Sequence, residues 1–174
     1  MFDTKDKTML IFNVIAGLIL LIGILMLVAK LARKTDMVGE SAPSFLYSPI
    51  NGDGEAWMHP KEYQWITFFV FATQCPHCTD AVPLWNTLID EDNQYGMIVG
   101  LSMSSSGETI EFMADNNTKF PVILVGGEFM EGYSISGTPS TITIHNGIID
   151  NIAVGKPDEQ DMSYLIAIHR KGEL

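Results

Sequence analysis

The chain has 174 residues, with 21 acidic and ten basic side chains and a formal net charge of −11. Residues 36–174 hold 19 of the acids and five of the bases, so the formal net charge of this part is −14. The sequence shows no basic patch of the kind that phosphate backbones require, which argues against nucleic-acid binding. The length is sufficient for one domain with a substantial core and a short appendage.

The N-terminal part of the chain is strongly apolar. Residues 9–29, MLIFNVIAGLILLIGILMLVA, contain no charge and a single amide, Asn13. About 20 apolar residues match the hydrocarbon thickness of a bilayer, so we expect a short tail at 1–8 and one transmembrane anchor at 9–32. The alternative is a cleaved signal peptide, but its apolar region spans only ~7–15 residues before a small-x-small cleavage site.

Basic residues flank the apolar segment on both sides. Lys5 and Lys7 precede it, and Lys30, Arg33 and Lys34 follow it. This count weakly places the C-terminal part inside the cell. The thiol chemistry described below favours the opposite orientation, with the folded domain outside the cytoplasm.

The next segments predict a linker and the first strands. Residues 33–44 are polar, with one glycine and one proline, and are expected to tether a domain spanning 45–174. Asn51-Gly52-Asp53-Gly54 lies between two short apolar pieces, which predicts a hairpin. Residues 63–73, YQWITFFVFAT, are almost continuously β-branched or aromatic. This run predicts a strand buried on both faces of a sheet.

Helical and strand patterns then alternate. Residues 75–93 predict a helix, because one stripe carries the apolar side chains Ala81, Leu84, Trp85, Leu88 and Ile89. We expect a second buried strand at 95–103 and a helix with serine caps at 105–117. Residues 120–135 form an apolar segment with a double glycine, interpreted as an insert with a short helix.

The C-terminal part completes an α/β pattern. A hairpin is expected around Asn146-Gly147, followed by a helix that opens near Pro157. The order of these elements predicts one mixed central sheet with helices on both faces.

The only two cysteines, Cys75 and Cys78, lie in FATQCPHCTDAVPLW (71–85). One hypothesis is a pair of unrelated buried thiols, since free cysteine is among the most buried residues. A second is a metal site, but a structural zinc site needs four ligands. The remaining candidate ligands lie at no pairing distance in the sequence and are expected on the surface or in strands: His59, His145 and His169.

The third hypothesis, a redox pair, is favoured. A Cys-x-x-Cys at a strand-to-helix junction places Cys75 at the helix N-terminus, where the dipole and free amides stabilise a thiolate. Pro76 suits the first helical turn, because its missing N–H would have no partner there. Cys75 is the expected attacking thiol and Cys78 the resolving thiol. No dissociable cofactor and no metal are needed for this chemistry.

The histidine between the cysteines has two interpretations. A hydrogen bond or positive charge from His77 would stabilise the Cys75 thiolate, lower its pKa and make the disulfide more oxidising. The alternative is an exposed loop residue without a role.

FATQCPHC, followed by Pro83, resembles the active-site strand and kinked helix of the thioredoxin superfamily. Four further stretches resemble membrane-anchored TlpA/ResA-type thiol–disulfide oxidoreductases: VGESAPSF, VGLSM, FPVILVGGEFMEGYSISGTPS and GIIDNIAVG. The resemblance spans residues 38 to about 170 and implies a thioredoxin-like fold. It also implies that Pro139 is a cis-proline facing the disulfide and that Thr138 offers backbone groups to a substrate chain.

Two features depart from the family pattern. Typical thioredoxins carry a buried aspartate six residues before the first cysteine, whereas this chain has Phe69. The Pro-His dipeptide is the pairing of DsbA-type oxidants, although these carry a helical insert that this chain is too short to hold.

The resemblance implies a membrane-tethered enzyme that exchanges disulfides with client proteins in the periplasm or another extracytoplasmic space. Cytochrome c or metalloprotein maturation would be the setting, and a membrane redox partner would recharge the cysteine pair. Two alternatives stay open. One is a DsbA-like oxidant, and the other is a thioredoxin-fold copper chaperone, which would need His145 close to the sulfurs.

The tuning role of His77 predicts the effect of a substitution. His77→Ala should raise the pKa of Cys75 and make the disulfide less oxidising, because the thiolate loses a stabilising partner. Titration of the thiolate tests this. An unchanged titration curve would contradict the role.

Overall fold

The computed structural model describes residues 16–22, 37–90 and 96–171. The chain divides into two units, Met1–Asp36 and Met37–Leu174. In the first unit residues 16–22 are helical, while the predicted tail at 1–8 and the rest of the predicted anchor lie outside the described residues. Among the described residues, no helix is both long enough and apolar enough to cross a membrane.

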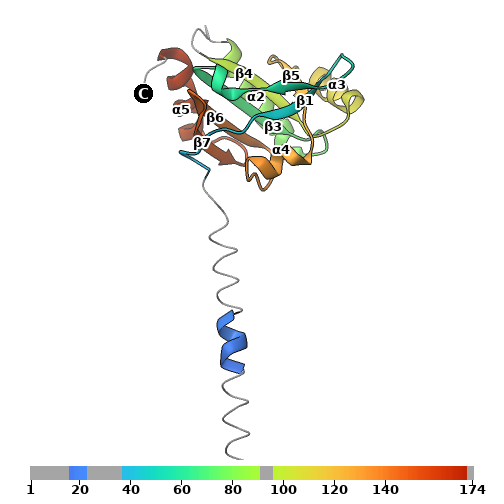
Figure 1. Cartoon of the computed structure of the whole chain (residues 1–174). Helices are drawn as coiled ribbons and strands as arrows, with labels where there is room; N and C mark the ends of the chain where they lie inside the picture. The colour runs from blue at the N-terminus through green and yellow to red at the C-terminus, as the bar shows by residue number, and fades with distance from the viewer. Residues whose placement is uncertain (1–15, 23–36, 91–95, 172–174) are drawn as a thin grey trace, which may run out of the picture. The chain divides into compact units, whose positions relative to one another are not determined.

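A mixed sheet of seven strands forms the centre of the second unit, in the order β2-β1-β5-β4-β3-β6-β7 (Figure 1). The β3, β4 and β5 strands run parallel, and the remaining neighbours pair antiparallel. The strands are β1 (Phe45–Pro49), β2 (Ala56–Met58), β3 (Trp65–Phe71), β4 (Met97–Ser102), β5 (Val122–Leu124), β6 (Ser140–His145) and β7 (Ile148–Val154).

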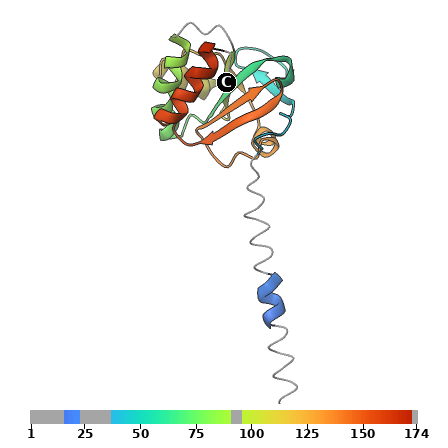
Figure 2. The same cartoon turned by 90° about the vertical axis from the view of Figure 1, so that its left-hand side faces the viewer.

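Helices cover both faces of this sheet, which confirms the predicted α/β architecture. The helices are α2 (Pro76–Asp90), α3 (Ser106–Asp115), α4 (Gly127–Gly132) and α5 (Glu159–Lys171), with a 3-10 turn η1 (Pro60–Glu62). One core contains side chains of α2, α3 and α5, and Figure 2 shows α2 and α5 together on one side of the sheet. The other core contains Phe129 of α4 together with Ala42 and Phe45.

The position of β3 in the sheet explains why its sequence is almost continuously apolar. All seven of its residues are buried, because β4 and β6 flank it and a core lies on each face. A strand covered on both faces has no solvent side, so its sequence does not alternate between polar and apolar residues. The predicted buried strand is therefore confirmed.

The segment predicted as an insert differs from the expectation. Residues 122–124 form β5, which pairs with β1 on one side and β4 on the other. Three residues are too few to display a period of two, so the sequence pattern could not distinguish this strand from an apolar loop. The short helix expected nearby is present as α4.

His169 is also not where the sequence analysis expected it. Its side chain is only 2% exposed and lies on α5, and its Nε2 is 2.9 Å from the hydroxyl of Thr67 on β3. Its Nδ1 has no hydrogen-bond partner within the part of the chain that the structure describes. Burial lowers the pKa of His169 to about 4, because an imidazolium would lose its hydration there.

Burial of His169 predicts an acid-labile fold. The folded-state pKa is about 4 and the ordinary value is 6.5, so between these pH values the unfolded chain binds more protons than the folded one. The free energy of unfolding should therefore fall as the pH drops from about 6.5 towards 4, by on the order of 3 kcal/mol from this group. Denaturant titrations of wild type and His169→Gln measure it, and the variant should show a shallower pH dependence.

His59→Gln is a matched control, because the His59 side chain is only half-buried. Equal slopes in wild type and His169→Gln would show that this histidine does not contribute to acid lability.

Candidate redox site

The loop between β3 and α2 carries the first cysteine. The Phe71 carbonyl, at the end of β3, accepts a hydrogen bond from Met103 N at 2.9 Å, and the Ala72 carbonyl accepts one from Cys75 N at 3.2 Å. The α2 helix begins at Pro76, a residue that suits the first turn because no N–H goes unpaired there. Cys75 therefore lies at the N-terminus of α2, as the sequence predicts.

The two thiols are three residues apart but have different surroundings. Both are free in the structure, Cys75 half-buried and Cys78 buried. Cys78 is 0% exposed and belongs to the core that includes Phe69 and Trp85. Reagents and substrates can therefore reach the sulfur of Cys75 and cannot reach that of Cys78.

This difference separates the acidities of the two thiols. Burial opposes ionisation of Cys75, but hydrogen bonds with the side chains of Cys78 and Thr138, and with the backbone of Cys78 and His77, hold its pKa below the ordinary value. Burial is the main cause that raises the pKa of Cys78 to about 12, and its hydrogen bond with Cys75 adds to the shift. Of the two thiols, Cys75 is therefore the one that ionises more readily, which fits the attacking role predicted for it.

The loop before β6 lies against Cys75. The Thr138–Pro139 peptide bond is cis, as the resemblance implied. The Cys75 thiol donates to the Thr138 carbonyl at 3.5 Å. The Pro139 carbonyl accepts a hydrogen bond from Gly155 N at 2.8 Å, which ties this loop to the end of β7. The structure therefore places Thr138, with Pro139 next to it in the chain, against Cys75, which is distant in the sequence. A role of these two residues in substrate binding stays a prediction.

The main chain of His77 contributes to the site. Its side chain is exposed, and its backbone is among the groups that lower the pKa of Cys75. An alanine at this position keeps that backbone. Any lowering of the Cys75 pKa by the His77 imidazole must therefore add to the lowering by the His77 main chain.

Aromatic rings occupy the position behind the cysteines where typical thioredoxins carry an aspartate. Phe69 stacks on Trp85, with ring centroids 4.7 Å apart and an interplanar angle of 6°, and Phe120 meets Phe69 edge-on at 5.2 Å. The groups that shift the pKa of Cys78 include no carboxylate. No aspartate or glutamate is buried among the described residues, so the structure shows no buried carboxylate beside Cys78.

His145 lies at the opposite end of the sheet from the cysteines. It pairs with Trp65 at the start of β3, whereas Val70, near the end that leads to Cys75, pairs with Ser140. Its ring stacks on the indole of Trp65 with centroids 4.2 Å apart. The copper-chaperone alternative required His145 close to the sulfurs as a third copper ligand. The position of His145 does not meet this requirement. No group of three potential ligand side chains that could hold a metal occurs among the described residues.

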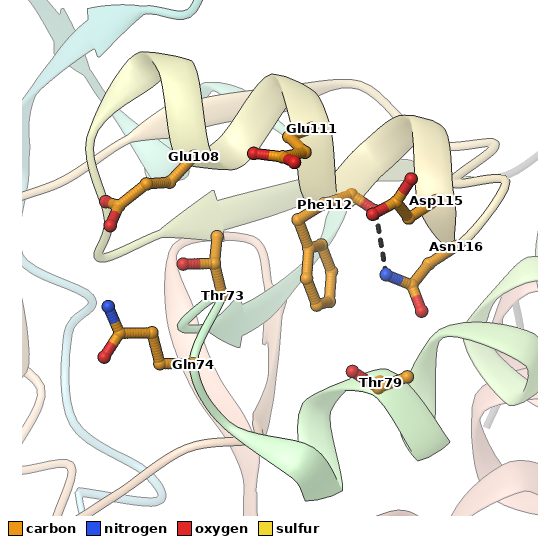
Figure 3. Close-up of a pocket in the computed structure, with 8 residues that line it drawn as sticks. All are labelled: Thr73, Gln74, Thr79, Glu108, Glu111, Phe112, Asp115 and Asn116. Atoms are coloured by element: carbon orange, nitrogen blue, oxygen red, sulfur yellow. Dashed lines mark hydrogen bonds between the residues drawn. The ribbon is translucent and has the colours of Figure 1, made fainter.

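A cavity of about 330 Å³ opens beside the cysteine loop, which the sequence analysis did not predict. Figure 3 shows the side chains of α3 facing Thr73 and Gln74, the residues just before Cys75. Three carboxylates at helical spacing line it, Glu108, Glu111 and Asp115. A surface of this charge attracts cationic groups and repels anions. The spacing of these carboxylates, three and four residues apart, is visible in the sequence. That Thr73 and Gln74 line the other side of the cavity is visible only in the structure.

Comparisons with known proteins bear on the fold. No model of a known protein family matches the chain, and no curated protein matches it. Solved structures do match. StoA from Bacillus subtilis has a TM-score of 0.59 at 20% identity, covering 71% of this chain and 96% of that chain.

Two further solved structures agree. The thioredoxin domain of a thiol-disulfide oxidoreductase from Bacteroides vulgatus has a TM-score of 0.61 at 15% identity, covering 75% of this chain and 95% of its own. A thiol-disulfide isomerase from Corynebacterium glutamicum has a TM-score of 0.57 at 22% identity, covering 75% and 97%. The chain thus has a thioredoxin-like fold with a Cys-x-x-Cys pair.

The unequal thiols predict unequal alkylation. In Cys78→Ser the remaining Cys75 should react readily with iodoacetamide at neutral pH. In Cys75→Ser the buried Cys78 should react at least ~100-fold more slowly, because it is both inaccessible and protonated. Mass spectrometry of timed samples measures both rates. Similar rates in the two variants would contradict the assignment, and denaturant should abolish the difference.

Proposed function

We propose that the protein is a thiol–disulfide oxidoreductase that exchanges disulfides with client proteins. The observation that carries the proposal is an accessible Cys75 of lowered pKa in contact with a buried Cys78 of raised pKa. Attack on a disulfide requires a thiolate, and resolution requires a second thiol within reach. The thioredoxin-like fold supports the same chemistry.

The exchange conserves electrons at each step. The Cys75 thiolate attacks one sulfur of a client disulfide, a mixed disulfide forms, and the client's other sulfur leaves as a thiolate. Cys78 gives its proton to the departed client thiolate or to water, attacks the Cys75 sulfur and releases the second client sulfur as a thiolate. The client disulfide has gained two electrons, and Cys75 and Cys78 have lost them. The reverse sequence inserts a disulfide into the client.

In this proposal, the loop beside Cys75 positions the client segment, and burial protects Cys78 from other disulfides. The Thr138 backbone and Pro139 would hold the extended client segment beside the sulfur, in the way that the resemblance implies. The Thr138 carbonyl already lies 3.5 Å from Cys75. Burial of Cys78 keeps it from reacting with disulfides in solution, so it would react only with the Cys75 sulfur, once that sulfur is held in a mixed disulfide.

We place this activity outside the cytoplasm, with residues 9–32 as a membrane tether. Cysteine pairs of client proteins form and persist as disulfides in oxidising compartments, which is where an exchange enzyme finds substrates. A membrane redox partner would return the pair to its working state. Cytochrome c or metalloprotein maturation fits such a tethered enzyme, as the TlpA/ResA resemblance implies.

The direction of exchange depends on the reduction potential. A stabilised Cys75 thiolate favours the reduced pair and makes the disulfide more oxidising, and the Pro-His dipeptide points the same way. The resemblance to TlpA/ResA-type proteins covers more residues and favours reduction or exchange with a dedicated client. We adopt the second view, with a DsbA-like oxidant as the alternative.

Equilibration of the full chain with glutathione buffers, read by thiol alkylation, tests the function. Formation of a Cys75–Cys78 disulfide is expected. A potential near that of thioredoxin, about −270 mV, supports reduction, and one near that of DsbA, about −120 mV, supports oxidation.

A trapping variant tests the mixed disulfide directly. Cys78→Ser should accumulate a disulfide-linked adduct with a peptide disulfide, because the resolving thiol is missing, and Cys75→Ser should form none. Failure of wild type to form an internal disulfide under any buffer would refute the proposed function.

A further inference from the structure

Hydroxyl groups link the loop before Cys75 to helix α3. The oxygen of Ser104 accepts two hydrogen bonds from Thr73, one from its N–H and one from its hydroxyl, each at 3.0 Å. The N–H of Ser104 donates to the Ser102 hydroxyl at 3.2 Å. The Ser102 oxygen lies 2.7 Å from that of Thr109, and Thr109 donates to the Ser105 carbonyl at 2.8 Å.

In this series of hydrogen bonds, the donor and the acceptor of each bond can be assigned in only one way. Since the Thr109 hydroxyl donates to a carbonyl, the Ser102 hydroxyl must donate to Thr109, which leaves the Ser102 oxygen free to accept from Ser104. Ser102 and Thr109 are both 0% exposed. Breaking a link here would leave a buried polar group without a partner, which costs more than the bond itself is worth. This series of hydrogen bonds therefore anchors Thr73 rigidly.

The segment anchored in this way contacts the backbone of Cys75 and the sulfur of Cys78. The Ala72 carbonyl accepts the Cys75 N–H at 3.2 Å. The Ala72 backbone also forms a hydrogen bond with the sulfur of Cys78 that lowers its pKa. Thr73 is the next residue, so the position of its backbone sets where these two contacts lie. Ser104, which itself contacts neither sulfur in the hydrogen bonds described, holds that backbone.

We propose that Ser104 is a positioning residue for the Cys75–Cys78 pair. By fixing Thr73 through two hydrogen bonds, it keeps Cys75 against the first amides of α2 and against Thr138. The consequence for exchange rates rests on the proposed function. The consequence for the Cys75 thiolate does not, because thiolate formation needs no disulfide partner.

The test is the pH dependence of iodoacetamide reaction at Cys75 in the reduced full chain. Ser104→Ala removes the acceptor of both Thr73 bonds, so the profile should move to higher pH and the rate near pH 6 should fall by ~3-fold or more. Ser104→Thr keeps a hydroxyl and should restore the wild-type profile. Thr73→Val keeps the N–H bond alone and should lie between wild type and Ser104→Ala.

Ser106→Ala is the matched control. Ser106 donates to the Ile50 carbonyl at 2.7 Å, a hydrogen bond at the same end of α3 that does not reach the cysteine loop. This variant should keep the wild-type profile. An unchanged profile in Ser104→Ala, or an equal shift in Ser106→Ala, would overturn the proposal.

Circular dichroism shows which variants remain folded. If Ser104→Ala unfolds, Thr73→Val decides, and a wild-type profile in that variant overturns the proposal. If wild type never forms its disulfide while the Ser104→Ala profile still shifts, the proposed function fails and the positioning role stands.

Discussion

The pairing of β3 with its two neighbours is the constraint on which the site depends. Its parallel partner β4 leads into the segment with Ser102 and Ser104, and its antiparallel partner β6 begins just after Pro139. Both segments therefore meet at the end of β3 that leads to Cys75. Backbone pairing with both neighbours and side-chain packing into a core on each face hold this register in place, because a slip would force both cores to repack.

Burial at this end of β3 also gives two identical side chains different chemistry. Cys75 sits at the rim, where hydrogen bonds outweigh the penalty for ionisation, and Cys78, one helical turn later, sits in an aromatic core where burial dominates. The same stacking of Phe69 on Trp85 that stabilises the core also gives Cys78 apolar surroundings. Packing and reactivity are thus set by the same side chains.

Hydroxyl groups are the hydrogen-bond partners of several buried polar side chains in the described domain. Buried examples are the bond between Thr67 and His169, that between Ser102 and Thr109, and that between Trp85 and Thr141. Neutral groups such as these avoid the desolvation cost of buried charges. Among the described residues no carboxylate is buried, and three of them, Glu108, Glu111 and Asp115, line the cavity beside Cys75.

The sequence pattern by itself determined the α/β architecture and the strand–helix junction with Cys75 and Cys78, because these depend on local periodicity and motif. The thioredoxin-like fold and Pro139 as the cis residue came from the resemblance of several stretches to a known family. The tertiary structure decided that β5 joins the sheet, that His169 is buried, that His145 lies far from the sulfurs and that Ser104 anchors the cysteine loop. Each of these depends on contacts between residues distant in the sequence. Strand register and helix packing create such contacts, and no local periodicity encodes them.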